Sequence, residues 1–202
     1  MSNVLVIDVG TQSMRGIIFD DKGNLLAKKQ VKYMPYLAKE NGYMEQSADM
    51  YWQVLCQITN SLNTEFPQLM QSVLAMSVDT FRDTAVLLDE NNEPVRNCIL
   101  WSDQRIADIS KPLPLKQRFL FSLVGMTRVI NAIRSKIKTS WVQQNEPEVW
   151  AKVKKVVHIS AYLNYKLTGN LMDSYASTIG HLPFDSKGKK WLTKNALLYP
   201  VF

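Results

Sequence analysis

Three short apolar segments in the first 33 residues constrain the fold of this chain more than any other feature. Residues 4–8, 14–20 and 25–33 have the length and apolar character of β-strands. Gly10 interrupts the chain between the first two, and residues 21–24 form a turn before the third. That turn has the Lys-Gly signal of a tight hairpin, whereas the first turn is longer and rich in hydroxyl groups. The sequence therefore predicts a three-stranded meander whose first turn does more than reverse the chain.

Helical periodicity begins after the meander. Tyr51, Leu55 and Ile58 recur at helical spacing, so a core-facing helix is expected from Ser47 to about Glu65. Further strands are expected at 73–79, 84–88 and 98–101, with a hairpin turn at 89–92 between the last two. Helices are expected at 104–109, 116–124 and 147–166. Within the last of these, residues 152–157 are alternatively a strand. A meander followed by alternating strands and helices predicts an α/β fold with a mixed sheet rather than an all-parallel dinucleotide fold.

Composition limits the classes of partner. The chain has 202 residues, of which 46% are hydrophobic and 21% charged, which favours one domain with one substantial core. Its 24 Lys and Arg exceed its 18 Asp and Glu, and the resulting charge of +6 favours anionic ligands such as phosphates, nucleotides or nucleic acid. The basic residues form short scattered clusters, so a solvated face explains them better than a nucleic-acid patch.

The cysteines and the two ends of the chain bear on the cellular compartment of the protein and on whether the chain is truncated. Cys56 and Cys98 lie in apolar contexts, which favours buried thiols over a disulfide framework. The start of the chain has neither a signal peptide nor a membrane-spanning stretch, so we expect a cytoplasmic protein without a membrane partner. The apolar ending at 197–202 indicates a truncated chain, with a docked terminal segment as the alternative.

The segment DVGTQSMR, from Asp8 to Arg15, is the sharpest chemical feature. Gly10 permits close approach of a ligand to the backbone, and the following amides and hydroxyls can form an anion-binding concavity. Arg15 offers a planar fork to phosphate oxygens, and Asp8 could hold Mg²⁺. The residues predicted to bind phosphate are Gly10, Thr11, Gln12, Ser13 and Arg15. Alternatively, this is an ordinary Asx-type turn with Arg15 facing solvent.

At this point the sequence resembles a family, the FGGY carbohydrate kinases, which include glycerol, xylulose, ribulose and gluconate kinases. The segment above is similar to the family's amino-terminal phosphate motif. Further similarities follow in family order, at GYMEQ (42–46), WSDQR (101–105), the Leu-Thr-Gly at 167–169 and the Asp and Ala-Ser of 173–177. Each match is weak alone, but together they cover nearly the whole chain.

The resemblance implies two actin-like (ribonuclease-H-like) domains, each a mixed sheet flanked by helices, with residues 1–202 forming an incomplete amino-terminal domain. It implies transfer of the γ-phosphoryl group of ATP, with Mg²⁺, to a hydroxyl of a small sugar or polyol. In this family the general base is an aspartate, which we expect beyond residue 202, so no catalytic residue is assigned here. We therefore expect the 202-residue chain alone to be inactive.

The same resemblance suggests substrate contacts. Arg82-Asp83-Thr84 is similar to the Arg-Glu-Thr with which glycerol kinases hold substrate hydroxyls, which favours a polyol or an open-chain sugar. Trp101 is expected to end a strand and to present its indole to the substrate. The alternatives are a surface ion pair at Arg82 and Asp83 and a core role for Trp101. Asp103 and Arg105 are expected to lock the following helix to the sheet.

Some residues depart from the family pattern, and other functions stay open. Thr139 replaces an apolar residue in the Lys138–Trp141 signature, while His158 and His181 are expected to be structural. A non-catalytic actin-like module that binds sugar or phosphate is the main rival. Nucleic-acid binding rests on net charge alone and would show a steep salt dependence. Oligomeric state is left open, with a homodimer among the options.

Overall fold

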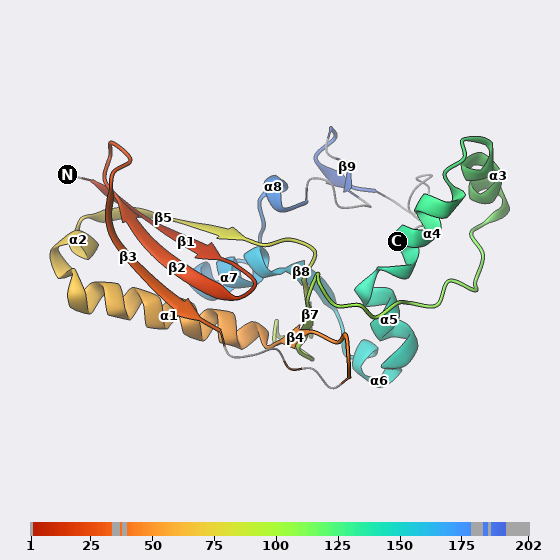
Figure 1. The fold of residues 1–202 in the computed structure, drawn as a ribbon, viewed down its shortest axis with the longest axis horizontal. Helices are drawn as coiled ribbons and strands as arrows, with labels where there is room; N and C mark the ends of the chain where they lie inside the picture. Colours follow the sequence, from red (N-terminus) through yellow and green to blue (C-terminus); the bar gives the residue numbers. More distant parts are fainter. Residues whose placement is uncertain (1, 34–36, 38–39, 179–183, 186, 193–202) are drawn as a thin grey trace.

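The computed structural model describes residues 2–33, 37, 40–178, 184–185 and 187–192. A four-stranded sheet forms one end of an elongated molecule (Figure 1). Its strands are β1 (Asn3–Val9), β2 (Ser13–Phe19), β3 (Leu25–Lys32) and β5 (Val73–Thr80), in the order β3-β2-β1-β5. The first three are antiparallel, whereas β5 runs parallel to β1. The predicted meander and the predicted mixed sheet are both confirmed.

Helix α1 (Ala48–Glu65) covers one face of this sheet (Figure 1). Ile58 and Leu62 on the helix are fully buried against Ile7 and Ile18 of the sheet. Gly16 of β2 lies beneath the helix, where a Cβ atom would overlap the Ile58 side chain and come within 3.0 Å of Leu62 Cδ1. The absence of a side chain at this position allows the helix to approach the hairpin closely. A short helix, α2 (Pro67–Gln71), then leads into β5.

A second helix, α7 (Ile159–Thr168), joins the same core through Ile159, Tyr162 and Leu163. The Tyr162 hydroxyl donates a hydrogen bond of 2.6 Å to Asp49 in the first turn of α1. Burial of the ring, and then the bond to this carboxylate, raise the pKa of Tyr162 well above its usual value. Two helices from distant parts of the sequence are therefore joined over one hydrophobic core.

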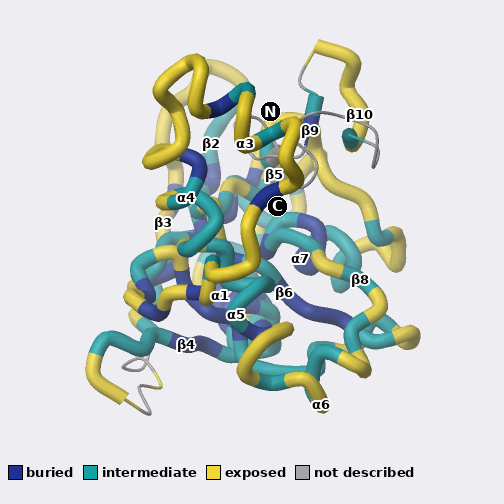
Figure 2. The backbone as a smooth tube through the Cα atoms, turned by 90° about the vertical axis from the view of Figure 1, so that its right-hand side faces the viewer, coloured by how far each residue is buried: buried dark blue, intermediate teal, exposed yellow. Residues whose placement is uncertain are grey.

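Two small ladders connect the sheet to the rest of the chain. Strand β4 (Glu45–Gln46) pairs with β7 (Cys98–Ile99), and β6 (Ala85–Leu88) pairs with β8 (Lys155–His158). Figure 2 shows β4 and β6 buried, whereas α3 is largely exposed. The remaining elements are α3 (Leu115–Leu123), α4 (Thr127–Ser135), α5 (Lys138–Asn145), α6 (Pro147–Trp150), α8 (Tyr175–Thr178), β9 (Phe184–Asp185) and β10 (Lys190–Trp191).

The structure corrects several predicted elements. Residues 104–109 are not helical, because their backbone groups bond to distant partners: Gln104 N–H to Gly42 O and Ala107 N–H to Ser135 O. The predicted helix at 147–166 is divided into α6, β8 and α7, so the alternative strand at 152–157 is confirmed only over 155–157. The turn at 89–92 is present, with Asp89 accepting two backbone N–H bonds, but β6 and β7 pair with other strands rather than with each other.

Of the two cysteines expected to be buried thiols, Cys98 is buried and Cys56 is half-buried. Both cysteines are free, and burial raises the pKa of the Cys98 thiol to about 12, which makes it unreactive at neutral pH. None of the described helices combines the length and the apolar character that crossing a bilayer requires.

We predict that Gly16→Ala lowers the free energy of unfolding by about 1–3 kcal/mol, because the new methyl group overpacks the interface with α1. Urea unfolding followed by circular dichroism would measure the change. Ile58→Ala alone should cost about 2–5 kcal/mol by leaving a cavity. The double variant should lose less than the sum of the two, since the cavity accepts the methyl group. Additive losses would contradict this account of Gly16.

Candidate functional site

The β1–β2 turn forms one side of an open pocket of about 560 Å³. Within the turn, the Gly10 N–H donates to the Ser13 carbonyl at 3.0 Å, and a Cβ atom on Gly10 would lie 3.0 Å from that same oxygen. Glycine therefore fits this turn without displacing its backbone. The pocket is lined by Gly10, Thr11, Gln12, Ser13, Arg15, Met44, Trp101 and Ser102. All five residues predicted to bind phosphate thus face one space.

Asp8 and Arg15 lie opposite each other on β1 and β2 and form an ion pair of 2.7 Å. Both side chains are about one-third exposed, and Arg15 lines the pocket. Arg15 is therefore ion-paired with Asp8, in contrast to the alternative in which it only faces solvent. On its other side, Asp8 is in register with Asp79 of the parallel strand β5. Side chains paired in this way project from the same face of a sheet, so a second carboxylate lies beside Asp8.

Tyr33 lies close behind this ion pair. Its hydroxyl is buried, and no hydrogen-bond partner for it occurs among the residues that the structure describes. Burial, and then the negative charge of Asp8, raise the pKa of Tyr33 above its ordinary value, so the phenol stays neutral. Its backbone N–H donates to the Gln12 carbonyl at 3.0 Å, which fixes the outer part of the turn against β3.

Trp101 follows β7 in a turn, rather than ending a strand as predicted, and it is 55% exposed. A core role is therefore excluded. The residue is attached at two points: its backbone N–H donates to Thr84 Oγ1 at 3.1 Å, and its indole Nε1 donates to Thr11 Oγ1 at 3.0 Å. The second bond joins residues 90 positions apart and places the indole directly beside the β1–β2 turn.

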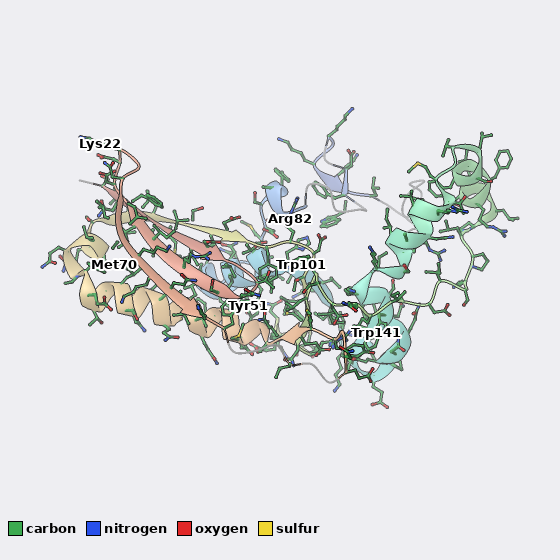
Figure 3. The ribbon with its side chains drawn as sticks, viewed as in Figure 1. Lys22, Tyr51, Met70, Arg82, Trp101 and Trp141 are labelled. Atoms are coloured by element: carbon green, nitrogen blue, oxygen red, sulfur yellow. The ribbon has the colours of Figure 1, made fainter. Side chains whose placement is uncertain are left out.

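Arg82 and Asp83 lie next to this pocket without lining it. Both are exposed in the segment after β5, and Asp83 adopts φ 62°, a conformation that aspartate tolerates better than most residues. Figure 3 shows Arg82 and Trp101 at the end of the sheet opposite Met70. Thr84, which follows Asp83, is buried and accepts the Trp101 N–H bond. Thr84 therefore links the predicted substrate residues, because it follows Arg82 and Asp83 in the chain and is hydrogen-bonded to Trp101.

Sequence reasoning missed the residues that support the turn from behind. Gln46 donates through Nε2 to the Thr11 carbonyl at 3.3 Å and accepts a short hydrogen bond from the Tyr51 hydroxyl. Gln30 donates to Ser13 Oγ at 3.0 Å. These partners come from other strands and from α1, so their sequence separations follow no local periodicity. The GYMEQ motif was the one signal that pointed to Gln46.

A buried charge network holds the wall that presents Met44 and Trp101. The side chain of Arg105 is 1% exposed and binds Glu45 at 2.9 Å and Asp103 at 2.8 Å. Its guanidinium lies over the rings of Tyr43 and Trp141, at 3.8 Å and 4.5 Å from their centroids. The planar guanidinium binds two carboxylates and also stacks on aromatic rings, so lysine could not replace it here. Arg105 therefore locks β4 to α5, not a following helix to the sheet as predicted.

Asp103 is the acceptor at the centre of this network. Burial alone would raise the pKa of its carboxyl, but hydrogen bonds from the Arg105 side chain and the Met44 N–H outweigh it, and the pKa lies below its usual value. Lys138 of α5 donates to the carbonyl oxygens of Asp103 and Arg105 at 2.7 and 3.0 Å. Burial lowers the pKa of Lys138. The Lys138–Trp141 signature is thus placed in the network in spite of Thr139.

Comparisons with known proteins show the family of this chain. Residues 3–194 match the sequence profile described as "FGGY family of carbohydrate kinases, N-terminal domain". The chain belongs to the FGGY family of carbohydrate kinases. It is 34% identical to a xylulose kinase of Lactococcus lactis subsp. lactis over 198 residues, which are 95% of this chain and 38% of that protein. The chain therefore spans less than half the length of this relative.

Solved structures establish the fold. A ligand-bound xylulose kinase from Lactobacillus acidophilus superposes with a TM-score of 0.76 at 19% identity, covering 100% of this chain and 40% of that one. Plasmodium falciparum glycerol kinase with ADP gives a TM-score of 0.75 at 20% identity, covering 98% and 40%. The expected actin-like α/β fold of the FGGY kinases is confirmed.

We predict that the Asp103 network makes stability depend on pH in the acidic range. Because the pKa of Asp103 is lower in the folded chain, its contribution is complete above the unfolded value of about 4 and disappears as the pH falls through the folded value. At pH 7, Asp103→Asn should be less stable by about 3–5 kcal/mol. The gap from wild type should shrink by pH 3 in urea unfolding.

A matched control is Asp21→Asn, which makes the same chemical change at an exposed residue of the β2–β3 turn. It should follow the wild-type pH profile. An Asp103→Asn gap that stays constant from pH 7 to pH 3 would show that the carboxylate charge is not what stabilises the network.

Proposed function

We propose that the complete protein transfers the γ-phosphoryl group of ATP to a hydroxyl of a small sugar or polyol. This chain would supply the amino-terminal part of its phosphate- and substrate-binding site. The observation that supports the proposal most directly is the hydrogen bond between Trp101 Nε1 and Thr11 Oγ1, since it joins a phosphate-type turn to an exposed aromatic side chain. A phosphoryl donor and a carbon-chain acceptor need such neighbours.

The phosphate side consists of the β1–β2 turn. Successive backbone N–H groups and the hydroxyls of Thr11 and Ser13 can donate to phosphate oxygens in the concave turn. The Arg15 guanidinium is positioned by Asp8, so it can present its remaining N–H groups to a phosphate. These residues would orient the donor and stabilise its charge without reacting themselves.

The carboxylates beside the turn fit a magnesium ion. Mg²⁺ bound together with nucleotide phosphates takes one or two protein carboxylates and keeps several waters. Asp8, partly exposed at the strand end, and Asp79, on the same face of β5, offer that donor set. Magnesium held there would neutralise part of the phosphate charge.

The acceptor side consists of Trp101, Arg82 and Asp83. The exposed indole face offers apolar contact to a carbon chain, and a carboxylate can accept hydrogen bonds from two neighbouring hydroxyls. Arg82 would donate to other oxygens of the acceptor. We therefore propose a polyol or an open-chain sugar as the acceptor. The relatives named above include kinases of both kinds.

The rest of the site is proposed to come from a second domain. The general base, an aspartate in this family, and the adenosine pocket would lie there, and closure of the two domains would exclude water from the donor. We predict negligible phosphoryl transfer by the 202-residue chain alone, because the aspartate that would accept the proton is proposed to belong to the second domain. Purified chain and complete protein would be compared by coupled ADP release with glycerol, erythritol, xylulose, ribulose and gluconate.

The outcomes separate the proposals. Turnover by the isolated chain would overturn the two-domain account. Binding of an acceptor by the complete protein without any turnover would instead favour the non-catalytic binding module. Turnover that excludes every polyol and open-chain sugar would contradict the assignment of Arg82 and Asp83.

We predict that Asp83→Asn in the complete protein raises the KM for the acceptor by roughly 10- to 100-fold, as expected for loss of hydrogen bonds to a charged group. The KM for ATP should change little, because Asp83 does not line the phosphate pocket. Steady-state kinetics with each substrate varied in turn would measure both. Glu90→Gln, at an exposed turn, is the matched control. An equal rise in the two KM values would indicate a structural defect instead.

A further inference from the structure

One buried tyrosine contacts three segments that hold the phosphate turn. Tyr51, in the first turns of α1, is completely buried. Its ring packs edge-on against Tyr33 at 5.4 Å and in a tilted arrangement against Phe81 at 5.8 Å, and its hydroxyl bonds to Gln46. These three neighbours come from the ends of β3, β5 and β4.

Each of the three neighbours donates a hydrogen bond to a different carbonyl around the turn. The Phe81 N–H bonds to Val9 O at 3.1 Å, and the Tyr33 N–H bonds to Gln12 O at 3.0 Å. The Gln46 side chain bonds to Thr11 O at 3.3 Å. The carbonyls of residues 9, 11 and 12 are thus held by three different segments, two of which follow β3 and β5 on the two flanks of the β1–β2 hairpin. Gln46 differs from the other two because it acts through a side chain.

The orientation of the Gln46 amide follows from chemistry. A backbone carbonyl can only accept, so the atom that faces Thr11 must be the amide nitrogen. The amide oxygen then faces Tyr51, whose hydroxyl must donate. The Thr11 carbonyl therefore determines which way Gln46 points, and the Tyr51 hydroxyl stabilises that orientation by donating to the amide oxygen. Because Gln46 is 3% exposed, water does not offer it an equivalent alternative partner.

The bond to Thr11 has a second consequence. Thr11 O is held by Gln46, and Thr11 Oγ1 accepts the indole N–H of Trp101. Moving the Thr11 backbone would move the hydroxyl that positions the indole. A chain of hydrogen bonds therefore runs from Tyr51 through Gln46 and Thr11 to Trp101.

We propose that Gln46, held in this orientation by its hydrogen bond with Tyr51, is a positioning residue that aligns the phosphate turn with Trp101 by holding the Thr11 carbonyl. Its kinetic consequence rests on the proposed function, but its structural consequence does not. If the alignment is lost, phosphoryl donor and acceptor should both still bind, in a poorer relative geometry. The expected defect is thus mainly in kcat, not in either KM.

The structural test follows the indole N–H groups by ¹⁵N–¹H NMR. The chain has five tryptophans, and Trp101→Phe identifies the resonance of Trp101. Gln46→Glu keeps the size of the side chain and an acceptor for Tyr51 but replaces the donor that faces Thr11. We expect the Trp101 resonance to shift and its N–H to exchange with water roughly 2- to 10-fold faster, the factor for loss of one hydrogen bond. The other four resonances should stay in place.

Two further variants keep the test decisive. Tyr51→Phe retains the ring packing and removes the hydroxyl that orients Gln46, so it should produce a smaller change at the same resonance. Gln57→Glu makes the matched substitution on the exposed side of α1 and should change nothing at Trp101. If Gln46→Glu fails to fold, Tyr51→Phe decides alone.

A Trp101 resonance identical to wild type in the folded variants would overturn the proposal. So would movement of all five resonances together, because that would indicate a general loss of structure. In the complete protein, a fall in kcat with both KM values unchanged supports alignment of the two substrates. Absence of activity in the wild-type protein would contradict the proposed kinase function and leave the NMR result to decide the role of Gln46.

Discussion

The close packing of α1 on the β1–β2 hairpin determines the geometry of the site. Because Gly16 has no side chain, Ile58 and Leu62 can approach the sheet directly. A helix held at this distance by its middle turns must place its first turns under the ends of the strands, where Tyr51 is buried. The polar groups around the turn therefore depend on an apolar contact that lies several residues away from them.

The second constraint is electrostatic. Burying Arg105 away from water is costly, and the cost is offset only because two carboxylates and two aromatic rings surround it. This requirement explains why the stretch after Trp101 has no regular secondary structure. Its carbonyl groups are used by Lys138 rather than by a helix. Charge pairing thus determines the wall of the pocket that presents Met44 and Trp101. Apolar packing of α1 determines the position of the β1–β2 turn on the other side.

Local patterns were sufficient to predict the meander with its β1–β2 turn, α1 and the mixed sheet, because each depends on periodicity or on a turn within a few residues. Local patterns failed where the structure of a segment depends on partners that are distant in the sequence. The helix expected at 104–109 does not form, because backbone N–H groups of this segment donate to residues 42 and 135 instead. The hairpin expected between β6 and β7 was displaced by pairing with β8 and β4. Gln46 and Thr84 could not be assigned a role, since both act on residues that only the fold brings near.

The hydrogen bond from Trp101 to Thr11 also limits what the indole can distinguish. An indole has a single N–H, and here it is already used within the protein. A molecule that enters the pocket therefore meets Trp101 as a flat apolar surface, which responds to the length and shape of a carbon skeleton but not to the handedness of its hydroxyls. Any stereochemical preference must come from the polar side chains around it, so chain length and configuration could change independently among relatives of this fold.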